Sequence, residues 1–363
     1  MKKTSEQDTF ESRLEGYFKD FFTIVATDDG DWTVKGFIDI YKNIYTIMNK
    51  SFLPRKIQKV GVPPIKCQGI KTKLVNFIAS NVAWEGKGKW VEPFVGSGVV
   101  LLNIQPERAL ATDSNKYIIQ LYKEIQSGKI TEILAQQFLE DLGDQLKRKG
   151  GDFYYEIRSR FNKTGSSLDF LFLNRSCFNG VIRFNSKGEF NVPYGHKPER
   201  FRQAYITKIV HQITWVRKVL RNKDWEFKAQ NWRNTLSDLS PDDFVYLDPP
   251  YIGRHTDYYN SWNDDEAIAL AQTAKILPCG FALSMWFENK YRKNEHLLKH
   301  WDGLTTKTFS HFYHVGSTEN LRNEMVEALV IKPASVPISS VTIELNQEIP
   351  QRDAMSLDLF HSL

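Results

Sequence analysis

The chain contains little cysteine, and its spacing carries no recognisable motif. Cys67, Cys177 and Cys279 are far apart among 363 residues. Such spacing indicates neither a disulfide framework nor a zinc site. We therefore expect free thiols, a reducing cytoplasmic location and no bound metal.

Long apolar runs are also missing. No stretch approaches the roughly 18 apolar residues of a membrane span, and the mean hydropathy is -0.42. The first residues lack the apolar core of a signal peptide. We therefore expect no membrane association and no secretion. With 41% hydrophobic residues, the chain can still form a large core or two domains.

Two common nucleotide-binding motifs are absent. The P-loop pattern does not occur, and Leu101 stands where a dinucleotide-binding turn has its third glycine. What remains is a Gly-Ser-Gly turn at 96–98, which lets the backbone approach a ligand closely. The next predicted strand, 108–113, ends in Asp113, which is placed to hold ribose hydroxyls. Together these features favour a nucleoside cofactor and disfavour a dehydrogenase.

One apolar run ends in an acid, two prolines and an aromatic residue. Residues 244–247 predict a buried strand. The prolines that follow stop it, because neither can donate to a sheet ladder. Asp248 is therefore expected at the carboxyl end of a strand, where open α/β sheets hold their ligands. A carboxylate, a rigid carbonyl and the ring of Tyr251 there suit a planar group that bears an exocyclic amine.

Positive charge is concentrated in one part of the chain. Residues 155–223 hold 14 Lys and Arg against 4 Asp and Glu, a balance of +10 in a chain of net charge +5. Within them, 170–195 interleave Arg, Asn and Lys with aromatic residues, and 186–189 predict a β-hairpin turn. Arg and Asn read base edges or bind phosphates, and an exposed aromatic can wedge between bases. We favour DNA contact here over an aromatic-packed hairpin without a ligand.

Five short motifs occur in a fixed order along the chain. They are Pro-Pro-Ile-Lys-Cys-Gln-Gly-Ile-Lys at 63–71, Val-Glu-Pro-Phe-Val-Gly-Ser-Gly at 91–98, Phe-Leu-Asn-Arg at 172–175, Gly-Glu-Phe-Asn-Val-Pro at 188–193 and Asp-Pro-Pro-Tyr at 248–251. In this order they resemble the Dam-type (class alpha, D12) DNA adenine-N6 methyltransferases, and the resemblance covers roughly residues 60–333. It implies an α/β fold: a Rossmann-like, S-adenosyl-L-methionine-dependent methyltransferase sheet with an inserted, mainly helical DNA target-recognition domain that contains a β-hairpin.

The resemblance also implies roles for particular residues. The catalytic motif is Asp248, Pro249, Pro250 and Tyr251. The cofactor positions are Cys67, Lys71, Glu92, Pro93, Phe94, Gly96, Gly98, Asp113, Asn231, Trp232 and Asp248. The DNA positions are Lys66, Arg175, Phe178, Asn179, Val181, Arg183, Asn185, Asn191 and Pro193, with Phe178 as the aromatic wedge. Two sites depart from the family pattern, since Cys67 replaces an indole and Asn231-Trp232 replaces Asp-Phe.

The domain boundaries follow from the same comparison. Residues 60–116 and 224–333 are expected to form the catalytic domain, and 117–223 the target-recognition domain. Residues 1–59 would be an extension of unknown role and 334–363 a flexible tail. Residues 254–262, rich in Tyr, His, Asn and Asp, are a candidate mobile lid.

Substrate and partners are also implied by the resemblance. Three longer stretches are similar to a family member that methylates the first adenine of GATATC. The expected partners are double-stranded DNA and a cognate restriction endonuclease that acts on the same site without stable binding. We expect a monomer.

In the implied mechanism, the Asp248 carboxylate and the Pro249 carbonyl accept the two amine hydrogens of a flipped adenine, and Tyr251 stacks on the base. Three alternatives remain open at this point. The same motif would serve cytosine N4, and Pro278-Cys279 could be a weak cytosine-C5 signal. The chain could also be a catalytically silent DNA-binding regulator on this scaffold, although binding alone would not require an intact Asp-Pro-Pro-Tyr.

Overall fold

The computed structural model describes residues 53–251, 262–289, 292–312 and 324–334. All described residues belong to one compact unit. Most of the predicted extension, the predicted lid at 254–261 and the tail from 335 onward lie outside the described residues.

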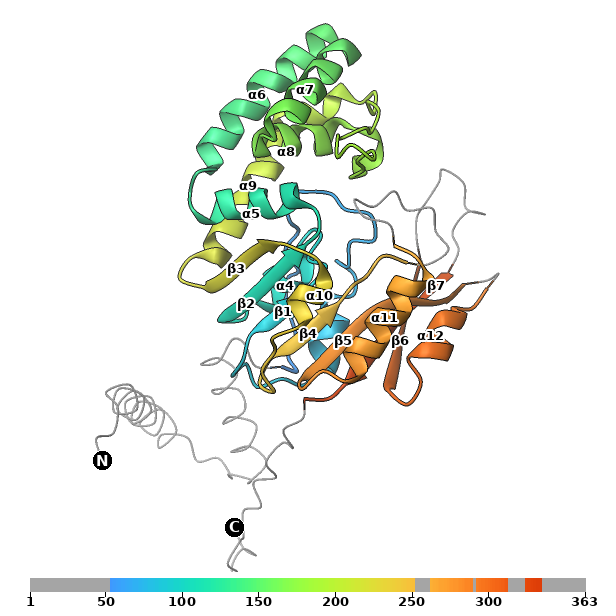
Figure 1. The fold of residues 1–363 in the computed structure, drawn as a ribbon. Coiled ribbons are helices and arrows are strands. Elements are labelled where there is room, and N and C mark those ends of the chain that lie inside the picture. The colour runs from blue at the N-terminus through green and yellow to red at the C-terminus, as the bar shows by residue number, and fades with distance from the viewer. Residues whose placement is uncertain (1–52, 252–261, 290–291, 313–323, 335–363) are drawn as a thin grey trace, which may run out of the picture. The chain divides into compact units, whose positions relative to one another are not determined.

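A seven-stranded, mostly parallel sheet lies at the centre of the described part (Figure 1). Its strands are β1 (Trp90–Glu92), β2 (Arg108–Asp113), β3 (Asp224–Ala229), β4 (Phe244–Leu247), β5 (Gly280–Asn289), β6 (Thr305–Phe312) and β7 (Glu324–Lys332). The spatial order is β3-β2-β1-β4-β5-β7-β6, and β7 alone among them runs antiparallel to both of its neighbours. The strand order therefore reverses between β1 and β4, which pair with each other in parallel.

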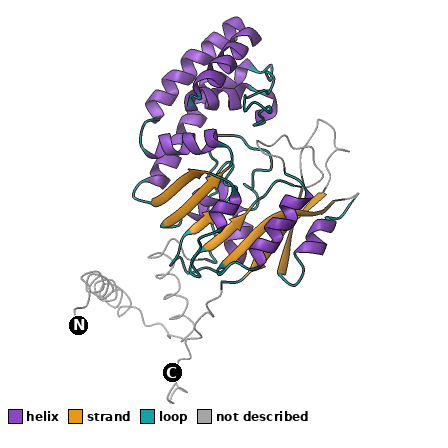
Figure 2. Cartoon of the chain, viewed as in Figure 1, coloured by secondary structure: helices purple, strands orange, loops and turns teal. Residues whose placement is uncertain are grey.

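Both faces of the sheet are buried, as expected for parallel strands. Along β4, Phe244 and Tyr246 belong to one hydrophobic core, whereas Val245 and Leu247 belong to a second. Helices lie on both sides of the strands (Figure 2). Those that contribute to the first core include α3 (Val75–Asn81) and α4 (Val99–Ile104). Those of the second include α10 (Trp232–Leu236), α11 (Asp264–Lys275) and α12 (Glu295–His300).

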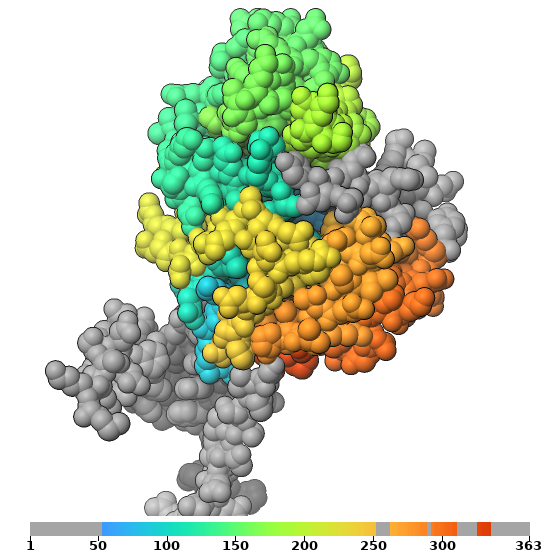
Figure 3. Space-filling view, in the orientation of Figure 1, coloured from blue at the N-terminus to red at the C-terminus, as the bar shows by residue number. Residues whose placement is uncertain are grey.

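A helical segment, residues 116–220, separates β2 from β3 in the sequence (Figure 1). It comprises α5 (Lys116–Gln126), α6 (Glu132–Lys149), α7 (Gly151–Thr164), α8 (Ser167–Ser176), the short 3₁₀ helices η1 (Phe178–Gly180) and η2 (Pro198–Phe201), and α9 (Gln203–Leu220). Its apolar residues continue the first core without a break. In the space-filling view this segment, in green, lies directly against the blue and yellow parts of the sheet region (Figure 3).

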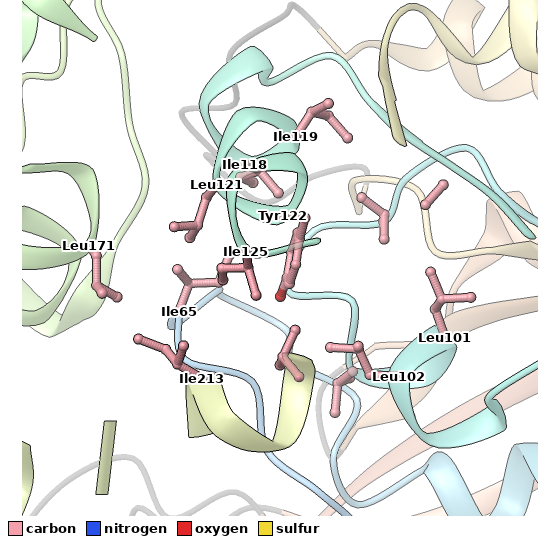
Figure 4. Close-up of a cluster of buried hydrophobic side chains, with 14 of the residues drawn as sticks. Ile65, Leu101, Leu102, Ile118, Ile119, Leu121, Tyr122, Ile125, Leu171 and Ile213 are labelled. Carbon is pink, nitrogen blue, oxygen red and sulfur yellow. The ribbon is translucent and has the colours of Figure 1, made fainter. Parts of the chain in front are cut away.

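The helix α5 connects the helical segment to the sheet. In Figure 4 its buried side chains lie between Leu171 and Ile213 on one side and Leu101 and Leu102 of α4 on the other, and all of these residues belong to the first core. The Tyr122 hydroxyl donates to the carbonyl of Ser97, inside the glycine turn. A buried hydrogen bond therefore joins the helical segment to that turn.

The predicted β-hairpin turn at 186–189 is present, without regular strands on either side of it. Phe184 and Phe190 form an isolated bridge, and the Asn185 N–H donates to the Glu189 carbonyl at 2.9 Å. The Asn185 side chain accepts from the amides of Lys187 and Glu189, each at 3.0 Å. Side-chain bonds within the turn take the place of a longer backbone ladder. No helix of the described residues is long and apolar enough to cross a membrane.

Candidate active site

A cavity of about 750 Å³ opens at the carboxyl ends of β1, β2 and β4. This is where the strand order reverses, the position at which open α/β sheets bind ligands. All four residues of the predicted catalytic motif line it, and so do all predicted cofactor positions except Gly98. The structure therefore brings together residues that span positions 67 to 251 of the chain.

An ion pair between Lys71 and Asp248 occupies the centre of the site. The Lys71 Nζ lies 2.8 Å from Oδ1 of Asp248, and the two side chains are 5% and 23% exposed. The same Nζ donates to the Gly69 carbonyl at 2.9 Å, which fixes the ammonium against its own loop. Within the described residues, Oδ2 of Asp248 has no hydrogen-bond donor, so it remains available to accept from a ligand.

In the pair of Lys71 and Asp248, each charge stabilises the ionised form of the other residue. Burial alone would lower the pKa of Lys71, but the carboxylate of Asp248, with Tyr251 and Glu327 nearby, raises it well above its ordinary value. Burial raises the pKa of the Asp248 carboxyl, and the ammonium of Lys71 opposes that rise. An ammonium this close favours the ionised carboxylate, so we describe the pair as charged.

The ring of Tyr251 is held from two directions. Its hydroxyl donates to Oε2 of Glu327 at 2.9 Å. The Lys71 ammonium lies 4.9 Å from the ring centroid, within the range of a cation–π contact. Because Pro249 and Pro250 restrict the preceding backbone, the ring is presented to the cavity in a defined orientation.

A second acid, Glu92, ends β1 and is almost fully buried at 2% exposure. Trp90 donates to its Oε1 at 2.8 Å through the indole nitrogen. Burial raises the pKa of Glu92 to about 8, against the opposing effect of the Trp90 bond, and the charge of Asp248 adds to the rise. This acid is therefore protonated at neutral pH in the free protein.

The glycine turn is pinned to the sheet by Asp113. One carboxylate oxygen accepts from the Gly96 amide at 2.9 Å and the other from the Asn115 amide at 2.8 Å. Gly96 has φ +47°, and a Cβ built there would meet nothing within 4 Å. Gly98, the N-cap of α4 at φ +68°, lies under the turn, where a Cβ would approach Tyr122 at 3.4 Å. Asp113 thus shapes the turn in addition to lining the cavity.

The Asn231-Trp232 pair lines the far side of the cavity. Asn231 caps α10 by accepting from the Arg233 amide at 2.9 Å. The Trp232 indole donates to Glu266 at 3.1 Å, and Arg233 also binds that carboxylate at 2.7 Å. An aromatic wall is therefore retained although the residues differ from those usual in the family.

The cavity suits a cationic nucleoside cofactor. Its lining includes four carboxyl groups, from Glu92, Asp113, Asp248 and Glu266, against the one cation of Lys71. The open space above Gly96 leaves room for a ligand against the backbone. Glu92 is protonated, and Lys71 and Arg233 pair with Asp248 and Glu266, so Asp113 is the acid of this lining whose charge no ion pair among the described residues balances. A positively charged cofactor would offset that charge. S-adenosylmethionine therefore fits the residues present.

All nine predicted DNA positions lie outside the lining of this cavity, although Ile182, which lies among them in sequence, lines it. Phe178 is 55% exposed, as a wedge requires, and Asn179 beside it has φ +53°. Arg183 donates through Nε to Asn191 at 2.8 Å, so these two predicted positions contact each other. Val181 is half-buried, and Asn185 and Pro193 are parts of the turn and its flank.

Two of the predicted DNA positions also join the helical segment to the loop at 60–74. Arg175 donates through Nε to the Pro64 carbonyl and through Nη2 to Gln212, both at 2.7 Å. The backbone of Lys66 exchanges two hydrogen bonds with the side chain of the buried Asn174. Burial, with Arg200 and Arg175 nearby, lowers the pKa of the Lys66 ammonium to about 8. Arg175 thus has a structural role, and its contact with DNA stays a prediction.

The sequence reasoning missed two acids, Glu327 of β7 and Glu266 of α11. A lone glutamate inside an apolar strand, or near the start of a helix, gives no local signal of its partner. Cys279, the weak cytosine-C5 candidate, is fully buried and precedes β5. Since β4 and β5 are parallel and Phe244 pairs with Gly280, Cys279 lies at the sheet edge opposite Asp248. Its position excludes it from the site.

Comparison with known proteins points to one family. The model of the D12 class N6 adenine-specific DNA methyltransferases matches residues 68–320. The chain is 33% identical over 236 residues to the type II methyltransferase M.MjaIII of Methanocaldococcus jannaschii, covering 58% of this chain and 78% of that protein. It is 32% identical to a DNA adenine methylase of Serratia marcescens, over 44% of this chain and 57% of the other. It is 28% identical to the type II methyltransferase M.FokI of Planomicrobium okeanokoites, over 74% of this chain and 42% of the other. The alignments thus span less than two thirds of the last two proteins.

Proposed function

Since the chain belongs to the D12 class of N6 adenine-specific DNA methyltransferases, which use S-adenosylmethionine, we propose that it methylates the first adenine of GATATC in double-stranded DNA. The adenine specificity of the family disfavours the cytosine-N4 alternative. The target sequence is supported by three stretches, 62–74, 174–188 and 251–262, that are similar to the EcoRV modification methylase. Two of them include proposed base-contacting residues.

The observation that carries the catalytic part of the proposal is the arrangement around Asp248. Lys71 holds one carboxylate oxygen, and the other faces the cavity without a donor among the described residues. That oxygen and the Pro249 carbonyl would accept the two hydrogens of an adenine amine. With both hydrogens held in one plane, the nitrogen lone pair is directed out of it. Asp248 then acts as an acceptor and as the counter-charge for the positive charge that develops on N6.

The remaining residues of the site orient and enclose the reactants. When bound, S-adenosylmethionine supplies an electrophilic methyl group on a positively charged sulfur. Glu92, Asp113 and the turn at Gly96 would hold it next to Asp248. The ring of Tyr251 would stack on a base swung out of the duplex, because N6 cannot be reached inside the helix.

Recognition of DNA is assigned to the helical segment and the turn that follows it. We take residues 117–223 as the target-recognition domain, and 60–116 with 224–333 as the catalytic domain. Lys66, Arg183 and the Asn residues 179, 185 and 191 are the proposed polar contacts. The exposed Phe178 would fill the gap left by the flipped base. The protein would act as a monomer in the cytoplasm, where a cognate endonuclease would cleave unmodified sites.

Sequence specificity is tested by measuring which sites in the treated DNA are protected from cleavage by restriction endonucleases. The full chain is incubated with S-adenosylmethionine and DNA that carries GATATC, GATC or neither, and each DNA is then digested at those sites. We expect protection at GATATC alone. Protection at GATC without GATATC would overturn the assigned target but leave the adenine activity intact.

The wedge is tested by Phe178→Ala. Ile276 is the matched control, since it is 83% exposed, caps the C-terminus of α11 and does not line the cavity. Phe178→Ala should lower methylation by roughly tenfold or more, because base–aromatic contacts contribute about 1–3 kcal/mol, and Ile276→Ala should not. Equal activity of the two variants would contradict the role of Phe178.

A further inference from the structure

Glu327 is a buried carboxylate in the middle of an apolar strand. Its side chain lies in β7, where the residue is 1% exposed, and the next residues, Ala328 to Ile331, are all buried and apolar. Burying a carboxylate costs several kcal/mol unless it is paired. An apolar residue at this position would avoid that cost, so we expect a group that binds the Glu327 side chain.

The partner is the catalytic motif. Oε2 of Glu327 accepts from the hydroxyl of Tyr251 at 2.9 Å. The carboxylate also contributes to raising the pKa of Lys71, whose ammonium lies over the same tyrosine ring. Glu327 therefore completes a connected set of four side chains: Asp248, Lys71, Tyr251 and Glu327.

The local strand geometry is adapted to this contact. Glu327 pairs with Trp286 of β5, whereas its neighbour Val326 pairs with Glu288, so that the register shifts between these two pairs. A β-bulge of this kind re-aims side chains, and bulges are common beside active sites. On its other side Glu327 pairs with Phe309 of β6, so two strands support its backbone.

We propose that Glu327 is a positioning residue for methyl transfer: its hydrogen bond fixes the ring of Tyr251 in the orientation that receives the flipped base. This rests on the proposed stacking role of Tyr251. The hydroxyl is held by Glu327, and the Lys71 ammonium lies against the ring. Without Glu327 the phenol can rotate about its side-chain bonds, and the stacked geometry is lost for part of the time.

The test compares three variants. Glu327→Gln keeps an acceptor for the tyrosine hydroxyl, Glu327→Met removes it at similar volume, and Tyr251→Phe removes the donor. We expect Glu327→Met to lower kcat by about tenfold, with the KM for S-adenosylmethionine within about twofold, because misplacement affects chemistry more than donor binding. Glu327→Gln should keep most of kcat. The Tyr251→Phe/Glu327→Met double variant should be no slower than the slower single variant, since both remove one interaction.

A second readout separates positioning from stability. With 2-aminopurine in place of the target adenine of a duplex that the wild-type protein methylates, Glu327→Met should change the fluorescence of the extruded base. Asp243→Asn is the control, because Asp243 is a buried carboxyl at the other end of β4 that accepts from the amides of Lys89 and Ser240. If Glu327→Met does not fold, Tyr251→Phe and Glu327→Gln test the same bond from either side.

The outcomes are distinct. Wild-type kcat in Glu327→Met, or losses that multiply in the double variant, would overturn the positioning role. Retained methylation in Asp248→Ala would instead overturn the proposed function itself, whatever Glu327 does.

Discussion

The pH dependence of stability should carry the signature of Glu92. The pKa of this buried acid is raised from 4.5 to about 8, so between these values the folded state binds a proton that the unfolded state has released. Stability is then lost as the pH rises, which is opposite to the usual behaviour of a paired carboxylate. A pKa raised from 4.5 to about 8 corresponds to roughly 5 kcal/mol at most, of which roughly 3–4 kcal/mol falls between pH 5 and pH 8.

Glu92→Gln removes the titration and keeps an acceptor for the Trp90 indole. We expect urea unfolding to show that the free energy of unfolding of the variant rises by roughly 3–4 kcal/mol relative to the wild type between pH 5 and pH 8. Glu226→Gln, an exposed change on β3, controls for the loss of one negative charge. A stability difference between wild type and Glu92→Gln that is the same at pH 5 and pH 8 would refute the reasoning.

Three further outcomes are expected. Lys71→Met leaves the Asp248 carboxylate without its buried counter-charge, so methyl incorporation should fall at least about a hundredfold and stability by about 3–5 kcal/mol; activity within threefold of wild type would contradict this. Gly96→Ala adds strain of about 1–2 kcal/mol at φ +47° and a methyl group in the cavity, and should weaken S-adenosylmethionine binding by calorimetry. Gly303→Ala is the control, because Gly303 has φ +75° and equally open space but lies outside the cavity. This variant should lose stability and keep its affinity for S-adenosylmethionine. An equal loss of S-adenosylmethionine affinity in both variants would show that backbone strain alone causes it. Since the pKa of Lys66 is about 8, DNA affinity measured by anisotropy should fall more steeply from pH 7 to pH 9 in the wild type than in Lys66→Met; parallel slopes would exclude Lys66 from the DNA contact.

Elements with a strong local signal were predicted from the sequence. The apolar run at 244–247 and the strand at 108–113 match β4 and β2 residue for residue. In contrast, β6 was missed, because Thr305–Phe312 is polar along much of its length and is a strand through its pairing with β7. The helix α8 was interpreted as part of a polar–aromatic stretch. Buried residues occur on all of its faces, so its sequence has no amphipathic period that would indicate a helix.

In the candidate site, too, some residues could be placed from the sequence and others could not. Motif residues at strand ends could be placed from the sequence, because parallel strands bring their carboxyl ends to one edge. The partners of these residues could not. Glu327 meets Tyr251 through the β5–β7 pairing, across 76 positions of the chain. Arg175 was predicted to contact DNA, whereas its bonds to Pro64 and Gln212 arise from the tertiary fold and have no signal in the local sequence.

The central claim is that Asp248 holds the amine of adenine for methyl transfer. The most direct measurement is nucleoside mass spectrometry of DNA treated with S-adenosylmethionine and either the wild type, Asp248→Ala or the control Asp243→Asn. The account predicts N6-methyladenine with the wild type and the control, and none above background with Asp248→Ala, although that variant still binds DNA. N6-methyladenine formed by Asp248→Ala at a rate comparable to the wild type would contradict it.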